Sequence, residues 1–135
     1  MAYIVRSLLG AGLVVGLLYV VIYGSSELSG EVITLRTFHP DGLATATSLW
    51  IVDDGARSYI RSGTPDSKWL ARIETDSNVE IVRAGVTQAY RAVLVPKRRE
   101  RVNGLMAEKY GWADSMMGWM RDPTETVAIR LDRDL

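Results

Sequence analysis

The sequence predicts a mainly β domain, a closed or half-closed barrel of about six antiparallel strands with two helices, preceded by one apolar segment. Beyond residue 30, most segments alternate apolar and polar residues with the period of two that is typical of half-buried strands. Turn signals such as Asp54-Gly55 separate these segments. In a chain of 135 residues, short antiparallel strands favour closure, because closure removes exposed sheet edges.

The first 26 residues are interpreted as a transmembrane anchor, and residues 27–135 as a single domain. Residues 7–26 carry no charged side chain, so we expect the lipid bilayer to be their partner in a single-pass protein. Arg6 precedes this run, and the positive-inside rule then places the domain outside the cytoplasm.

A cleaved signal peptide is the alternative interpretation of the same segment. The strictly apolar part, Leu8–Tyr23, is somewhat shorter than the ~20 residues of a usual spanning helix. Small residues at 24–26 also fit a cleavage site loosely. The long apolar run and the absence of an A-x-A site favour the anchor.

The domain begins with strands and a short helix. We expect three strands at residues 31–38, 44–54 and 56–63. A helix is expected over 65–76, with Thr64 as its N-cap, because threonine caps well and proline is tolerated at the first helical position.

The second half repeats this order with a longer helix. Two strands, 78–85 and 86–96, are expected to form a hairpin that bends near Ala84-Gly85. A helix over 97–120 follows, and residues 125–135 supply the last strand. One apolar stripe marks this helix: Val102, Leu105, Met106, Tyr110, Ala113, Met117 and Met120.

Composition excludes several classes of site. The net charge is zero, which disfavours a nucleic-acid binder. There is no cysteine, and the single histidine, His39, stands in the turn sequence HPDG. A histidine-cluster metal site, or a Ser-His-Asp triad built anywhere but around His39, is therefore not available, and no metal is expected.

Three stretches resemble a known family. LWIVDDGARSYIRSGTPDSKWLARIETDSNVEI (49–81), AYRAVLVP (89–96) and MAEKYGWAD (106–114) are similar to the split β-barrel flavin-binding group. The resemblance is to its flavin/deazaflavin-dependent nitroreductase and quinone-reductase branch, with pyridoxamine phosphate oxidases more distant. It covers residues 31–135, and Lys68-Trp69 and KYGW at 109–112 give it specificity.

The resemblance implies a cofactor, FMN or a deazaflavin coenzyme, whose phosphate lies at the loop before the first helix. The implied phosphate contacts are Arg61, Ser62, Gly63, Thr64, Ser67 and Lys68. Free N–H groups and the dipole of a helix N-terminus favour an anion there as well.

The cofactor ring would lie against the second strand. Candidates are Thr45, Thr47, Leu49 and Trp50, although Leu49 and Trp50 are more simply interpreted as core or surface. Tyr110, Trp112 and Met116 are candidates for an apolar substrate mouth, with core or dimer packing as the alternative.

The implied activity is hydride transfer from the reduced cofactor to a quinone-like or nitroaromatic acceptor, a small lipophilic molecule, in a homodimer. A non-catalytic, membrane-tethered binding or assembly module is the alternative. Asp66 and the lack of an arginine beside Lys68 favour it. A haem-handling barrel ranks last, because a histidine in a turn is a poor axial ligand candidate.

Overall fold

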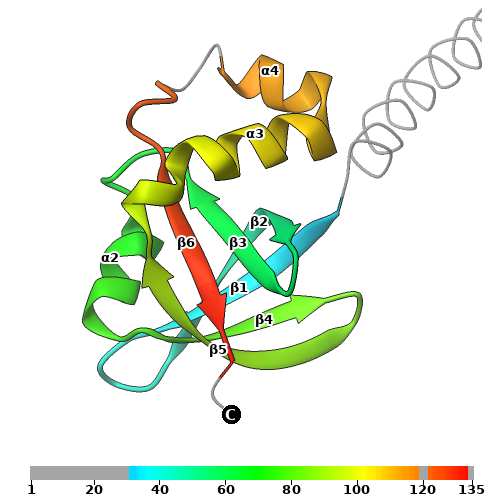
Figure 1. Ribbon diagram of the computed structural model, residues 1–135. Helices are drawn as coiled ribbons and strands as arrows, with labels where there is room; N and C mark the ends of the chain where they lie inside the picture. The colour runs from blue at the N-terminus through cyan, green and yellow to red at the C-terminus, as the bar shows by residue number, and fades with distance from the viewer. Residues whose placement is uncertain (1–30, 119–121, 134–135) are drawn as a thin grey trace, which may run out of the picture. The chain divides into compact units, whose positions relative to one another are not determined.

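The structure is a computed structural model that describes residues 31–118 and 122–133, and the predicted anchor lies outside them. Six antiparallel strands form a closed barrel in the order β1-β2-β3-β6-β5-β4 (Figure 1). The strands are β1 (Val32–Phe38), β2 (Ala44–Asp54), β3 (Arg57–Ser62), β4 (Asn78–Arg83), β5 (Val86–Leu94) and β6 (Val127–Asp132). The helices are α2 (Lys68–Thr75), the 3-10 turn η1 (Pro96–Arg98), α3 (Arg99–Tyr110) and α4 (Trp112–Gly118). The predicted barrel of about six antiparallel strands is confirmed.

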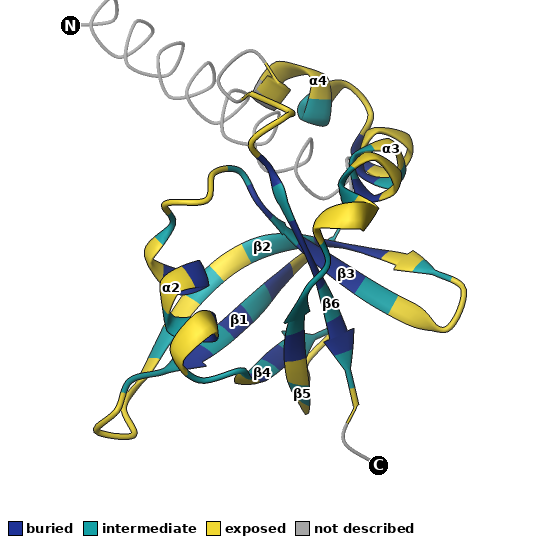
Figure 2. Ribbon diagram, turned by 60° about the vertical axis from the view of Figure 1, so that its left-hand side comes forward, coloured by how far each residue is buried: buried dark blue, intermediate teal, exposed yellow. Residues whose placement is uncertain are grey.

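Two cores lie on opposite faces of the sheet, and Figure 2 shows the alternation of buried and more exposed positions along the strands. The inner core fills the barrel with β-branched and leucine side chains, and α2 adds Trp69, Leu70 and Ile73 to it. The outer core lies where α3 packs against β2, β3 and β6, and it contains Val102, Met106 and Tyr110 from α3. The period-2 pattern therefore sorts each strand residue into one of two packed layers.

Two helix predictions need correction. α2 begins at Lys68 and not at Pro65, and its N-cap residue is Ser67. Thr64 caps a tighter turn, since its Oγ1 accepts a hydrogen bond from the Asp66 backbone N–H at 3.3 Å. Residues 63–66 are thus a loop held by short side chains, which compete with the helix for the same N–H groups.

The predicted helix 97–120 is also interrupted, since α3 ends at Tyr110 and α4 begins at Trp112. Gly111 between them has φ 55° and ψ −124°, a backbone conformation that glycine adopts far more easily than other residues. The predicted apolar stripe is confirmed over α3, where Val102, Met106 and Tyr110 are buried. Met120 lies outside the described residues.

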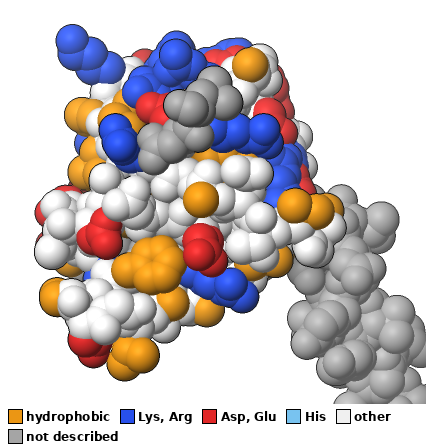
Figure 3. Space-filling view, turned by 90° about the horizontal axis from the view of Figure 1, so that it is seen from below, with side chains coloured by type: hydrophobic (Ala, Val, Ile, Leu, Met, Phe, Trp, Pro, Cys, Tyr) orange, Lys and Arg blue, Asp and Glu red, His pale blue; other side chains and the backbone are white. Residues whose placement is uncertain are grey.

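Within the described residues, no helix is long and apolar enough to cross a membrane. One face of the barrel shows Lys/Arg, Asp/Glu and hydrophobic side chains interspersed (Figure 3). This mixed surface agrees with the balanced charge of the chain.

Candidate functional site

A pocket of about 630 Å³ lies on the outer face of the barrel, where β1, β2 and β3 meet the loop before α2. Its lining residues are Val32, Ser48, Leu49, Trp50, Arg61, Ser62, Gly63, Thr64, Ser67, Trp69, Met106, Asp122 and Glu125. Most of this lining consists of the apolar side chains Trp50, Trp69 and Met106, a polar loop at 62–67, and an acidic edge at 122–125.

The loop at 62–67 is organised by one buried hydroxyl, that of Ser62, which is 1% exposed. Ser62 Oγ donates to the Thr64 carbonyl oxygen at 2.6 Å and lies 2.7 Å from Ser67 Oγ. Because Ser62 has only one hydroxyl proton, Ser67 is the donor in the second bond. The Thr64 N–H also donates to Ser62 Oγ, at 3.4 Å. The loop is therefore shaped before any ligand arrives.

Arg61, near the end of β3, lines the pocket, and its charge is already paired. Its Nη2 donates to Asp114 Oδ1 at 2.7 Å, and its Nη1 donates to Asn103 Oδ1 at 3.0 Å. Only 8% of the Arg61 side chain and 16% of the Asp114 side chain are exposed. This ion pair joins β3 to α4.

Asn103 of α3 extends this connection to the acidic edge of the pocket. Its Nδ2 donates to Thr126 Oγ1 at 3.0 Å, and Thr126 Oγ1 in turn lies 3.0 Å from the Pro123 carbonyl oxygen. A tight turn over 122–125 holds the edge, because Asp122 Oδ1 accepts from the N–H and the hydroxyl of Thr124. These bonds keep the pKa of Asp122 below its usual value.

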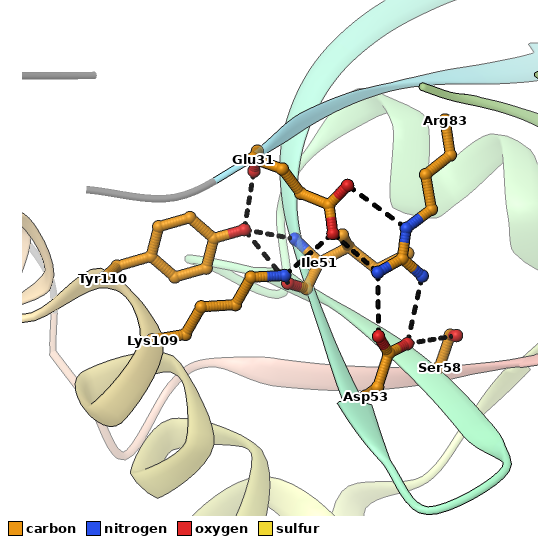
Figure 4. Close-up of polar contacts among 7 residues, drawn as sticks. All are labelled: Glu31, Ile51, Asp53, Ser58, Arg83, Lys109 and Tyr110. Atoms are coloured by element: carbon orange, nitrogen blue, oxygen red, sulfur yellow. Dashed lines mark hydrogen bonds and ion pairs between the residues drawn. The ribbon is translucent and has the colours of Figure 1, made fainter. Parts of the chain in front are cut away.

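Tyr110 stabilises this side of the barrel by stacking and by hydrogen bonds, and Figure 4 shows its hydroxyl beside Ile51 and Glu31. Its ring stacks on Trp50 with centroids 4.2 Å apart and planes 8° from parallel. Its hydroxyl accepts from the Ile51 N–H at 2.9 Å and lies 2.6 Å from the Glu31 carbonyl oxygen. Burial raises the pKa of Tyr110 to about 12, so the hydroxyl stays protonated.

A charged network continues from Tyr110 across the start of β1 (Figure 4). Lys109 Nζ donates to the Ile51 carbonyl oxygen at 2.8 Å and to Glu31 Oε1 at 2.9 Å. Arg83 donates to both Glu31 and Asp53. The hydrogen bonds from Arg83 lower the pKa of Glu31 and lower that of Asp53 to about 2. The network fixes the strand ends that carry Val32 and Trp50 to the pocket.

Several of the residues named from the sequence come together in this pocket: Arg61, Ser62, Gly63, Thr64, Ser67, Leu49 and Trp50. Others do not line it. Lys68 is an exposed residue at the start of α2. Thr47 pairs with Leu35 and Thr45 with Thr37, both buried, so the two threonines lie on the core face of β2.

The three candidates for a substrate mouth are also separate from the pocket. Tyr110 is 1% exposed and serves the packing and hydrogen bonding described above. Trp112 and Met116 lie exposed on α4, at 59% and 58%.

Sequence reasoning missed much of the lining. Val32, Ser48, Trp69, Met106, Asp122 and Glu125 were not named as site residues. The signal for Ser48 was present, because it lies on the same strand face as Trp50. Asp122 and Glu125 carry no local signal, because their place depends on how the segment before β6 returns to the barrel.

No protein-family model and no curated protein sequence matches this chain. Solved structures do resemble it. An F420 reductase is 15% identical, with 77% of this chain and 86% of that chain covered and a TM-score of 0.54. A NimC/NimA family protein from Clostridium acetobutylicum is 18% identical, with 75% and 72% covered and a TM-score of 0.57. HutZ, the haem storage protein from Vibrio cholerae, is 14% identical, with 77% and 82% covered and a TM-score of 0.59. The chain therefore has the split β-barrel fold that these proteins share.

Proposed function

We propose that this protein is a membrane-anchored oxidoreductase that binds FMN or a deazaflavin coenzyme in the outer pocket and reduces a quinone-like or nitroaromatic acceptor. One observation carries the proposal. Arg61, the loop at 62–67 and Trp50 gather around one pocket, in a fold that an F420 reductase and a NimC/NimA family protein also have. F420 is itself a deazaflavin, which supports this class of cofactor.

The size and donors of the pocket fit such a cofactor. A volume of about 630 Å³ lies within the roughly 300–1,000 Å³ of ordinary cofactor and ligand sites. Trp50 and Met106, which pack in the same outer core, offer apolar lining for a ring system, and Trp69 adds to it. Arg61 and the first N–H groups of α2 suit a phosphate.

The acidic edge of the pocket indicates which residues would bind the phosphate of the cofactor and which would bind its hydroxyl groups. Carboxylates such as Asp122 and Glu125 accept hydrogen bonds from sugar hydroxyls and repel a phosphate. The phosphate would therefore be held by Arg61 and the loop at 62–67, and the 122–125 segment would receive hydroxyl groups.

A reduced cofactor held there would supply a hydride, which the acceptor would take up together with a proton from solvent. The chain itself binds, orients and excludes water. Trp50, which lines the pocket and is half-buried, offers a ring on which an aromatic acceptor can stack. Tyr110, protonated and locked in hydrogen bonds, holds the Trp50 ring in place and is a positioning residue.

The membrane and the oligomer belong to the same proposal. An anchor at residues 7–26 keeps the domain close to the bilayer, where quinone-like acceptors concentrate. We place the domain outside the cytoplasm on the charge of Arg6, and we propose a homodimer.

Turnover by the full-length protein in detergent tests the enzymatic part. Reduced FMN or a reduced deazaflavin would be oxidised by a soluble quinone, followed by absorbance, with wild-type protein and two matched variants. Ser48 and Ala46 are exposed on one face of β2, but only Ser48 lines the pocket. Ser48→Tyr should abolish the protein-dependent rate, whereas Ala46→Tyr should leave it unchanged. Equal rates in the two variants would refute the site.

A second candidate, a non-catalytic module tethered to the membrane, is favoured by a specific observation. The pocket arginine is paired with Asp114, and two more carboxylates line the edge. A folded protein that binds neither cofactor would establish this candidate. A haem site has less support, because His39 lies beside Thr45 and is not among the residues that line the pocket.

A further inference from the structure

Arg61 both lines the pocket and forms an ion pair with α4. It lines the pocket, and its guanidinium also bonds to Asp114 at 2.7 Å. The Arg61 side chain is 8% exposed and that of Asp114 is 16% exposed, and the pair brings together positions 53 residues apart in the chain. An ion pair of this kind strongly disfavours the removal of one partner, because the other charge is then left buried and alone.

The described side chains of α4 are mostly exposed. Of its residues with described side chains, Trp112, Ser115 and Met116 are exposed, and Ala113 and Asp114 are half-buried. On its N-terminal side α4 is joined to α3 through Gly111, at φ 55°. Glycine at such a position lets the chain change direction with few steric limits. Among the described side chains, the Arg61–Asp114 pair is the hydrogen-bonded link between α4 and the barrel.

We propose that Asp114 is a displaceable counter-anion, so that an anionic ligand group that binds Arg61 in the pocket competes with Asp114 and loosens α4. This inference rests on the proposed function and deepens it, because it names the residue that sets the affinity for a phosphate-bearing cofactor. The carboxylate of Asp114 neutralises the cation and repels a second anion at short range. An incoming phosphate offers the guanidinium a substitute partner with more charge.

The same reasoning predicts that pocket occupancy and the state of α4 are coupled. A group that binds one state of an equilibrium more tightly shifts the population toward that state. Here the two states are Arg61 bonded to Asp114, with α4 attached, and Arg61 bonded to the ligand, with α4 released. Ligand binding must break the Arg61–Asp114 ion pair, so the affinity of the wild-type protein is lower than that of the same pocket with Arg61 unpaired.

Asp114→Asn separates charge from geometry, because the amide keeps an oxygen at the Oδ1 position. The control is Glu108→Gln, which removes the same charge from an exposed position on α3. Titration of the full-length protein with FMN, followed by cofactor fluorescence, should show about tenfold tighter binding to Asp114→Asn than to wild type, the size expected for loss of one nearby like charge. Glu108→Gln should bind as wild type does.

Hydrogen exchange on the wild-type protein gives a second measurement that needs no variant. With saturating FMN, amides at 112–118 should exchange faster and amides at 62–67 more slowly. Equal FMN affinity in Asp114→Asn and wild type, or unchanged exchange at 112–118 with FMN bound, would overturn the inference and leave the cofactor site standing. If neither protein binds FMN or a deazaflavin, the proposed function itself fails.

Discussion

Removal of the Tyr110 hydroxyl should destabilise the domain by about 2 kcal/mol, and the structure shows why. β1 begins at Val32, which pairs with Trp50, so the backbone of Ile51 lies just beyond the last rung of the β1–β2 ladder. The Tyr110 hydroxyl takes the place of the missing strand, since it accepts from the Ile51 N–H at 2.9 Å. It also lies 2.6 Å from the Glu31 carbonyl oxygen.

Tyr110→Phe leaves the buried Ile51 N–H and the half-buried Glu31 carbonyl oxygen without that partner. The cost of an unsatisfied buried group is roughly 1–3 kcal/mol. The substitution keeps the ring, so the stack on Trp50 at 4.2 Å should persist. The expected loss is therefore that of hydrogen bonding alone, without a cavity.

Equilibrium unfolding in urea, on the full-length chain in detergent micelles, measures this loss as a lower midpoint with an unchanged slope. Tyr90→Phe is the matched control, because the Tyr90 hydroxyl makes no hydrogen bond to the described residues and its ring is half-buried. The control should stay within about 0.5 kcal/mol of wild type. A Tyr110→Phe protein as stable as the control would refute the role given to the hydroxyl.

Three further predictions follow from the backbone and the charged network. Arg83 lowers the pKa of Asp53 to about 2. The ionised Asp53 therefore adds stability above the usual aspartate pKa range, and this stability is lost as the pH falls toward 2. Because the Asp53 side chain is 47% exposed, the gain is under about 1 kcal/mol. Asp53→Asn should flatten the acid limb of a stability–pH curve below pH ~4, and an unchanged curve would contradict the assignment. Ala84 has φ 50° and Gly85 has φ 78°, which is the pattern of a two-residue hairpin turn. Asparagine adopts positive φ more easily than alanine, so Ala84→Asn should raise the free energy of unfolding by about 0.5 kcal/mol. A loss of stability would show that the turn is of another type. Gly111→Ala should cost roughly 1–3 kcal/mol by backbone strain alone, since nothing lies within 4 Å of the added Cβ; a neutral effect in thermal unfolding would mean that α3 can run on into α4.

The barrel was predictable because its strands carry local signals. Residues 44–54 were expected as a strand, and β2 spans Ala44–Asp54. The bend at Ala84-Gly85 was also expected, and both residues have positive φ. Alternation and turn chemistry are properties of a few neighbouring residues, so one sequence is enough to reveal them.

The helix boundaries and half of the site were not predictable in the same way. The apolar stripe over 97–120 did not reveal that the chain turns at Gly111, because a helix and a broken helix can share one stripe. On β2, the pocket lining takes Ser48, Leu49 and Trp50, from both faces of one end of the strand, whereas Thr45 and Thr47 do not line it. Which part of a strand meets a pocket depends on α3 and the 122–125 segment, which pack there only in the folded barrel.

Titration of the purified full-length protein with FMN and with a deazaflavin, in detergent and followed by cofactor fluorescence, tests the central claim most directly. The account predicts saturable binding of at least one of them to wild type and to Ala46→Tyr, and loss of that binding in Ser48→Tyr. No saturable binding of either cofactor by the folded wild-type protein, or equal binding by both variants, would contradict it.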